Sequence, residues 1–148
     1  MNTRIVLLVI VLTIIIGSCS HQNNSFPQGA WSFISGDAIY HGDSLVNLSP
    51  RLYSGKDIKI YSEHNFNYVG RFKFDTTFID HFGGGTYILD GNKYEETIIY
   101  DYKKEAVGAK VKMLLELKND TLIQTFPVDD NWEKKRDFYY IVRYMRIK

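Results

Sequence analysis

The chain has 148 residues, a length typical of one domain, with 18 basic and 17 acidic side chains. Its single cysteine is Cys19, so an intramolecular disulfide is excluded. The near balance of charge argues against a nucleic-acid partner, because such binding depends on clustered cationic side chains.

The first 18 residues have the pattern of a secretory signal peptide. Arg4 is followed by a nearly unbroken apolar run over residues 5–16, which is too short for a comfortable transmembrane span. The run ends in IGSC, which resembles a bacterial lipobox, where the cysteine becomes the acylated first residue. We therefore expect residues 1–18 to be a helical signal peptide and residues 19–28 to be acylated Cys19 with a flexible tether. The alternative is an ordinary signal peptide in which this cysteine is incidental.

The strongest local signal is a β-hairpin over residues 83–101, GGGTYILDGNKYEETIIYD. Its centre, DGN, favours a tight type I′ turn between two alternating runs. Two registers are open: Tyr87 lies opposite Tyr94 if the loop is DG, and opposite Glu96 if the loop is GN. In both registers one face is aromatic and the other is charged, so we expect the aromatic face to point inward. That face comprises Tyr87, Leu89, Tyr94, Glu96, Ile98 and Tyr100.

Glu96 is the one carboxylate that this pattern places inside. An unpaired buried carboxylate is costly, so it must find hydrogen-bond donors or water, and the neighbouring tyrosine hydroxyls are candidates. Either Glu96 orients the polar group of a ligand in an aromatic cavity, or it belongs to a satisfied network in a filled interior.

Alternation of side chains predicts further strands on both sides of the hairpin, and helical periodicity is absent after Cys19. Residues 36–56 contain either a functional lid or a strand too weak to recognise. Residues 75–82 are expected to be a connection, after which the triple glycine leads into the hairpin. The other strand candidates are residues 29–35, 56–61, 64–74, 111–117, 121–126 and 138–148.

About eight strands in meander order predict an all-β fold, a single antiparallel up-and-down barrel over residues 29–148. Closure removes the exposed sheet edges, although a two-sheet sandwich is an alternative. A barrel of eight strands is just wide enough to be filled by side chains or to hold one small ligand. His64, Phe66 and Tyr68 share one face of their strand and join the hairpin tyrosines as candidate ligand contacts.

Gly29-Ala30-Trp31 resembles the Gly-x-Trp signature of lipocalins, and Arg146 stands on the last strand, where that fold places an arginine across the tryptophan ring. The resemblance implies that Gly29, Trp31 and Arg146 close the barrel through a cation–π contact. The hairpin is more similar still to lipocalin-like domains of unknown function in Bacteroidetes cell-envelope lipoproteins. Those domains share a Gly-Thr-Tyr strand, an Asp-Gly turn, a Tyr-x-Glu strand and a closing aromatic-x-Arg. Tyr144 stands where we expect tryptophan. The resemblance implies a lipid-anchored protein at the outer membrane, on its periplasmic or surface side.

Motifs for catalysis, metals and cofactors are not recognised. A Gly-x-Ser-x-Gly motif is absent, and the triple glycine lacks the spacing of a phosphate loop. The four histidines lack close ligand spacing. We therefore expect a non-catalytic protein with neither cofactor nor metal.

Three functions remain compatible with these patterns. The leading hypothesis is a membrane-anchored lipocalin-like lipoprotein that binds or buffers a small hydrophobic molecule. The second is an envelope interaction module with a filled barrel, whose loops dock a protein or a glycan. The third is an enzyme built around Glu96 and a tyrosine. Candidate ligand contacts are Tyr87, Tyr94, Glu96, Tyr100, Tyr68, Phe66 and His64.

Overall fold

The computed structural model describes residues 26–41, 44–49 and 53–148, which form nine β-strands and one short 3-10 helix. Cys19, the predicted signal peptide and most of the predicted tether lie outside these residues. The elements are β1 (Gly29–Tyr40), β2 (Ser44–Ser49), β3 (Tyr53–Tyr61), β4 (Asn65–Phe74), β5 (Thr77–Asp90), β6 (Lys93–Asp101), η1 (Lys104–Ala106), β7 (Lys110–Lys118), β8 (Thr121–Phe126) and β9 (Phe138–Arg146).

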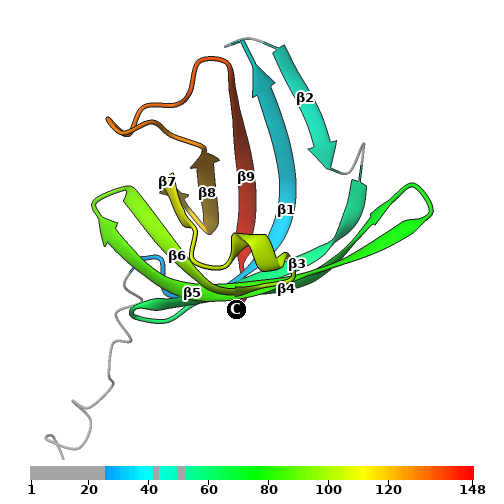
Figure 1. The fold of residues 1–148 in the computed structure, drawn as a ribbon, viewed down its shortest axis with the longest axis horizontal. Helices are drawn as coiled ribbons and strands as arrows, with labels where there is room; N and C mark the ends of the chain where they lie inside the picture. Colours follow the sequence, from blue (N-terminus) through cyan, green and yellow to red (C-terminus); the bar gives the residue numbers. More distant parts are fainter. Residues whose placement is uncertain (1–25, 42–43, 50–52) are drawn as a thin grey trace, which may run out of the picture.

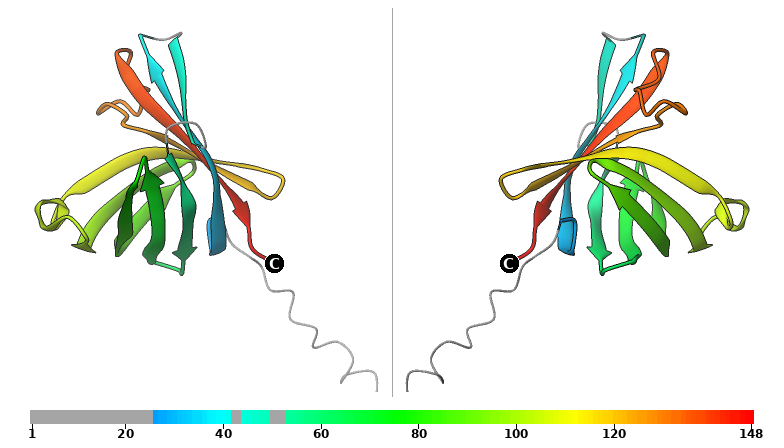
Figure 2. Two further views of the ribbon diagram at one scale, coloured as in Figure 1. Left: turned by 90° about the vertical axis from the view of Figure 1, so that its right-hand side faces the viewer. Right: turned by 90° about the vertical axis from the view of Figure 1, so that its left-hand side faces the viewer.

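Eight of these strands close into an antiparallel barrel (Figure 1). From β3 to β9 each strand pairs with the next, and β1 pairs with both β3 and β9. Figure 2 shows the C-terminus beside the start of β1, where Trp31 pairs with Arg146. The predicted all-β up-and-down barrel is confirmed, and the strands do not separate into two sheets.

β1 is longer than predicted, and it supports a ninth strand. Its residues 29–32 pair with β3, whereas residues 36–40 pair with β2. Of the two interpretations of residues 36–56, the unrecognised strand is the correct one, although residues 42–43 and 50–52 lie outside the described part. β2 therefore continues the wall past the point where β3 leaves β1.

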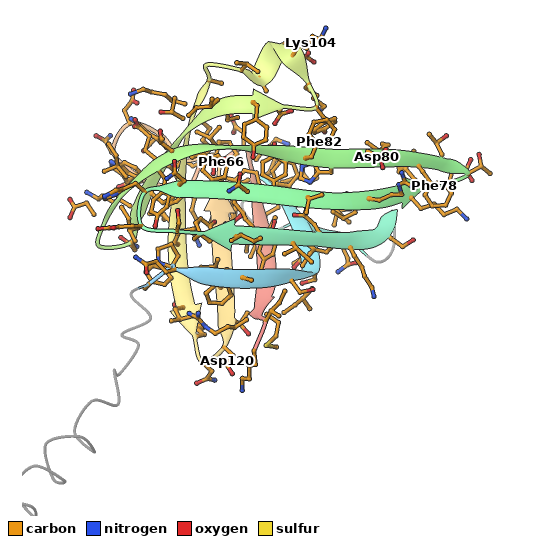
Figure 3. The ribbon with its side chains drawn as sticks, turned by 90° about the horizontal axis from the view of Figure 1, so that it is seen from below. Phe66, Phe78, Asp80, Phe82, Lys104 and Asp120 are labelled. Atoms are coloured by element: carbon orange, nitrogen blue, oxygen red, sulfur yellow. The ribbon has the colours of Figure 1, made fainter. Side chains whose placement is uncertain are left out.

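β5 is the longest of the described strands, with 14 residues, and it includes residues 77–82 of the segment 75–82 that was predicted to be a connection. Residues 77–82 pair with β4, so the β4–β5 hairpin reaches beyond the barrel wall, as Figures 1 and 3 show. The predicted connection was wrong because this part of β5 has exposed aromatic residues on its outer face, where Phe78 and Phe82 flank Asp80. Phe78, near the hairpin tip, is 63% exposed, so this part of the strand does not show the apolar-in, polar-out pattern.

The central hairpin adopts the second of the two predicted registers. Tyr87 lies opposite Glu96, and the two-residue loop is Gly91-Asn92. Of these two, only Gly91 has a positive φ, of 60°, which is the φ pattern of a type II′ turn rather than the expected type I′. The side chains of Tyr87, Tyr94 and Glu96 are buried, so the inner face was predicted correctly over most of the hairpin.

A β-bulge at Ile99 reverses the two faces at the end of β6. The prediction that Tyr100 points inward was wrong because one extra residue inverts every later side chain. Tyr100 points outward and its hydroxyl donates to Asn67. Asp101 takes the inward place and accepts a hydrogen bond from the Tyr68 hydroxyl.

The packed core fills the end of the barrel where the β3–β4, β5–β6 and β7–β8 hairpins turn. Its buried members are Trp31, Tyr61, Phe66, Tyr87, Tyr94, Ile98, Met113, Leu115, Leu122 and Tyr144. Aromatic rings meet there edge to face, with the Tyr61 ring centroid 5.7 Å from that of Tyr87 and 5.9 Å from that of Tyr94.

Candidate functional site

A cavity of about 340 Å³ opens at the other end of the barrel. Rings and aliphatic side chains from five strands form most of its wall, and four polar side chains complete it. The apolar lining is Phe33, Phe72, Phe74, Ile79, Phe126 and Val142, and the polar lining is Asp57, His81, Tyr102 and Tyr144. A mostly apolar cavity of this size with a few convergent polar groups is typical of a small-molecule site.

Asp57 and His81 come from strands on either side of β4 and meet across Gly70. The register places Asp57 opposite Gly70, and Gly70 opposite His81. A Cβ at position 70 would lie 2.7 Å from Asp57 Oδ1, so the glycine leaves room for the carboxylate. The Nδ1 atom of His81 lies 3.3 Å from the same oxygen. Gly70 therefore allows a close approach of side chains from the two neighbouring strands.

The Asp57 carboxylate is almost completely buried, with 1% of the residue exposed. The Tyr144 hydroxyl donates to its Oδ2 atom at 3.3 Å. Burial raises the pKa of Tyr144 well above its ordinary value, with the charge of Asp57 adding to the effect, so this hydroxyl remains a donor.

His81 forms part of the cavity wall, with 29% of its side chain exposed. Its ring stacks on Tyr68 with the centroids 4.4 Å apart, and it meets the rings of Phe72 and Tyr102 edge to face at 5.6 and 5.3 Å. The cavity wall thus contains an imidazole and a carboxylate that contact each other.

Glu96 lies deeper, in the packed end of the barrel, and its partner is Lys59. The Nζ atom of Lys59 donates to Glu96 Oε2 at 3.2 Å, and the Tyr94 hydroxyl donates to the same oxygen at 3.0 Å. Both charged residues are about 95% buried. The expected tyrosine donor is present, whereas the lysine was not identified from the sequence.

Lys59 was missed because β3 presents its apolar residues to the outside. Ile58 and Ile60 are 37% and 44% exposed, whereas Asp57 and Lys59 point inward. The rule that apolar side chains face the core fails when inward charges find opposite partners on other strands. The sequence contained one indication of this lysine. Because Glu96 is the one carboxylate that the hairpin pattern places inside, another strand has to supply an inward-facing basic residue.

Hydroxyl groups complete the network around this ion pair. The side-chain amide of Gln124 donates to the Tyr61 hydroxyl oxygen at 2.6 Å. Burial first, and the charge of Glu96 in addition, raise the pKa of Tyr61, and burial likewise raises the pKa of Tyr94. Among the described residues no buried side-chain nitrogen or oxygen lacks a hydrogen-bond partner. Around Glu96 the interior is therefore a satisfied network in a packed core.

The seven predicted ligand contacts do not line the 340 Å³ cavity. Phe66, Tyr87, Tyr94 and Glu96 are buried in the packed end. Tyr68 lies between the two ends, with its ring stacked on His81. Tyr100 and His64 do not point into the barrel, and His64 and Tyr87 line a separate open hollow of about 530 Å³ at the packed end.

His64 lies in the turn between β3 and β4, with 76% of its side chain exposed. The sequence predicted that it would share the inner face with Phe66. That prediction was wrong because β4 begins at Asn65, so the alternation does not extend back to the histidine. Its Nε2 atom lies 3.7 Å from the neighbouring Glu63 carboxylate.

The first and last strands meet through Trp31 and Arg146. The guanidinium carbon of Arg146 lies 4.2 Å from the centroid of the Trp31 ring, the contact that the lipocalin resemblance implies. The same guanidinium donates to the Gln28 carbonyl at 2.9 Å. A Cβ at Gly29 would lie 2.7 Å from Arg146 Nη1, so glycine keeps this space open.

No protein-family model matches the chain, and no curated protein matches it. The closed barrel of eight strands is consistent with a lipocalin-like fold. Its relation to envelope lipoproteins stays a prediction. Within the described residues, none of the helices is long and apolar enough to cross a membrane, and no three His, Cys, Asp or Glu side chains are grouped to hold a metal ion.

Proposed function

We propose that the protein is a membrane-anchored, non-catalytic, lipocalin-like lipoprotein that binds or buffers a small hydrophobic molecule. The observation that carries the proposal is the cavity of about 340 Å³ at one end of the barrel, with its mainly apolar and aromatic wall. The lipobox-like IGSC ending at Cys19 supports the anchor. The resemblance to envelope lipoproteins supports a place at the outer membrane.

The two ends of the barrel have different capacities for a ligand. Around Glu96 the side chains satisfy one another, so a ligand there would have to displace packed rings and hydrogen bonds. At the cavity end, a ligand that buries about 300 Å² of apolar surface gains roughly 7.5 kcal/mol at about 25 cal/mol per Å². Association costs at least about 4 kcal/mol. Apolar contact alone therefore gives weak binding, and tighter binding requires a polar group that holds the ligand.

Native mass spectrometry of a form starting at Ser20 tests the proposal. That form keeps every described residue of the closed barrel, and its folding is checked first by circular dichroism. After incubation with an extract of envelope lipids and metabolites, we expect a stoichiometric adduct. A bare mass throughout would contradict the proposal.

Two matched substitutions locate the adduct. Val142 lines the cavity, whereas Val69 is 58% exposed on the outer wall. Val142→Phe fills the cavity and should abolish the adduct, and Val69→Phe should leave it unchanged. An adduct that survives Val142→Phe with the same intensity would show that binding occurs elsewhere.

A second candidate function, docking to a protein or glycan of the envelope, is favoured by the protruding β4–β5 hairpin. Phe74 and Phe78 are 55% and 63% exposed there, and Figure 3 shows Phe78, Asp80 and Phe82 along β5 toward the tip. If docking is the function, Phe78→Ser should remove binding to envelope fractions. Ile88→Ser is the control, because Ile88 is 72% exposed at the far end of the same strand.

A further inference from the structure

Among the described residues, the inner face of the barrel has more carboxylates than cations. Lys59 is engaged by Glu96 at 3.2 Å. Asp57 is 1% exposed, and its ion-pair partner in the described part is His81, which carries charge only when protonated. Asp101 also points inward and accepts from the Tyr68 hydroxyl. The cavity lining therefore contains the carboxylate of Asp57 and neither a lysine nor an arginine.

The hydrogen bonds of the Asp57 carboxylate are long. Its contacts with His81 and Tyr144 are both 3.3 Å, beyond the usual ranges for N–H···O and O–H···O hydrogen bonds. A carboxylate has about four acceptor positions, and among the described residues these two contacts occupy two of them. A donor that enters from the cavity and approaches Asp57 closely would form a shorter, charge-assisted hydrogen bond.

The walls beside this carboxylate suit a cation. The rings of Phe33, Phe72 and Tyr102 line the same cavity as Asp57, and aromatic faces attract an ammonium group. An anionic head group would instead be repelled by the carboxylate. A neutral hydroxyl would gain a hydrogen bond without the attraction between opposite charges.

We infer that the ligand is an apolar primary amine, whose ammonium group donates to Asp57 beside His81 while its apolar body fills the aromatic cavity. This inference rests on the proposed function, since it requires the cavity to hold a ligand. Gly70 is part of this proposed site, because its lack of a side chain allows Asp57 and His81 to face the cavity together.

Isothermal titration of the form starting at Ser20 with three matched probes tests the inference at one fixed neutral pH. The probes are 4-phenylbutylamine, 4-phenylbutanol and 4-phenylbutyrate, which share one apolar body and differ in the head group. We expect the amine to bind about tenfold more tightly than the alcohol, with the carboxylate weakest. This comparison needs no variant, so it holds even where a substitution disturbs folding.

Asp57→Asn should remove the preference for the amine and leave the affinity for the alcohol. Asp80→Asn is the matched control, because Asp80 pairs with Arg71 on the exposed outer wall, and it should leave the preference intact. Equal affinity of the unsubstituted protein for amine and alcohol would overturn the inference while leaving the proposed function standing. Absence of binding by all three probes would also overturn it, and the extract experiment then decides separately whether the proposed function fails.

Discussion

The ion pair between Lys59 and Glu96 shows how a charged residue is accommodated in an aromatic core. The ammonium group donates to Glu96 and lies 5.1 Å from the centroid of the Phe66 ring. A buried pair of this kind contributes little compared with a well-packed apolar pair, but removing one partner leaves the other charge uncompensated. The ion pair therefore affects the free energy of unfolding mainly when one of its two partners is removed.

Lys59→Met should destabilise the fold by about 3–5 kcal/mol, because it leaves the buried Glu96 carboxylate without its cation. Denaturant unfolding followed by tryptophan fluorescence measures the loss. Adding Glu96→Gln should restore most of it, and Lys110→Met is the control, since Lys110 pairs with Glu95 at the surface. Equal effects of Lys59→Met and Lys110→Met would contradict the assigned role.

The buried tyrosines make stability depend on pH in the alkaline range. Burial raises the pKa of Tyr61, Tyr94 and Tyr144 above the ordinary value of 10.0. Above that value the unfolded state loses these protons while the folded state keeps them, so the free energy of unfolding falls as pH rises. The contribution of these three tyrosines to the free energy of unfolding is fully present below pH 10.

Unfolding curves in denaturant from pH 8 to pH 11 check this expectation. We expect stability to decline beyond about pH 10, with a smaller decline in Tyr144→Phe, which carries one fewer raised group. Exposed tyrosines should ionise in the folded state, whereas the tyrosinate absorbance of the buried tyrosines should appear only together with unfolding. A free energy of unfolding that is unchanged across this range would refute the expectation.

At the scale of elements, glycines on β4 and β5 let side chains from neighbouring strands reach one another. Gly83 lies between Tyr68 on β4 and Asp101 on β6, and a Cβ there would lie 2.5 Å from Tyr68 Cζ. Burial and the hydrogen bond to Asp101 raise the pKa of Tyr68, so its hydroxyl stays a donor. The triple glycine is thus part of the barrel wall.

Gly83→Ala should destabilise the protein by about 1–3 kcal/mol, because the added methyl group overlaps the Tyr68 ring. The same substitution in a Tyr68→Ala background should cost much less, and a double-mutant cycle measures the coupling. Additive effects of the two substitutions would show that the ring and position 83 do not compete for space.

Closure is a property of the whole molecule, and it joins residues more than a hundred positions apart. Arg146 stacks on Trp31 and donates to the Gln28 carbonyl, so it ties β9 to the start of β1. The β1–β9 pairing runs from Trp31 to Tyr40 with a bulge between Phe33 and Ser35. The resulting ring of strands places the cavity at one end and the packed core at the other.

Arg146→Met should reduce stability by about 0.5–2 kcal/mol from the lost cation–π contact alone. Hydrogen exchange should show faster opening along β1 and β9 than along β4 and β5. Arg71→Met is the control, because Arg71 lies on the exposed outer wall, and it should leave exchange in β1 and β9 unchanged. Uniformly faster exchange in all strands would argue against a local role in closure.

Part of the barrel interior could be predicted from the sequence, although the residues that line the cavity could not. The alternation of inward and outward side chains along the hairpin correctly placed Glu96 and Tyr94 inside, because alternation is a local property of a strand. The ion pair with Lys59, 37 positions away, could not be read locally, nor could the meeting of Asp57 and His81, 24 positions apart. The bulge at Ile99 leaves no clear mark in an unbroken apolar run, so the outward Tyr100 was also missed.

The sequence by itself determined an all-β chain, a tight turn within residues 90–92 and an aromatic inner face, since these follow from turn chemistry and side-chain alternation. Only the tertiary structure decided which inward residues meet, because pairing of distant strands sets their neighbours. The barrel thereby packs Glu96 with Lys59 and opens its cavity beside Asp57 and His81, at the opposite end from the residues that the sequence favoured.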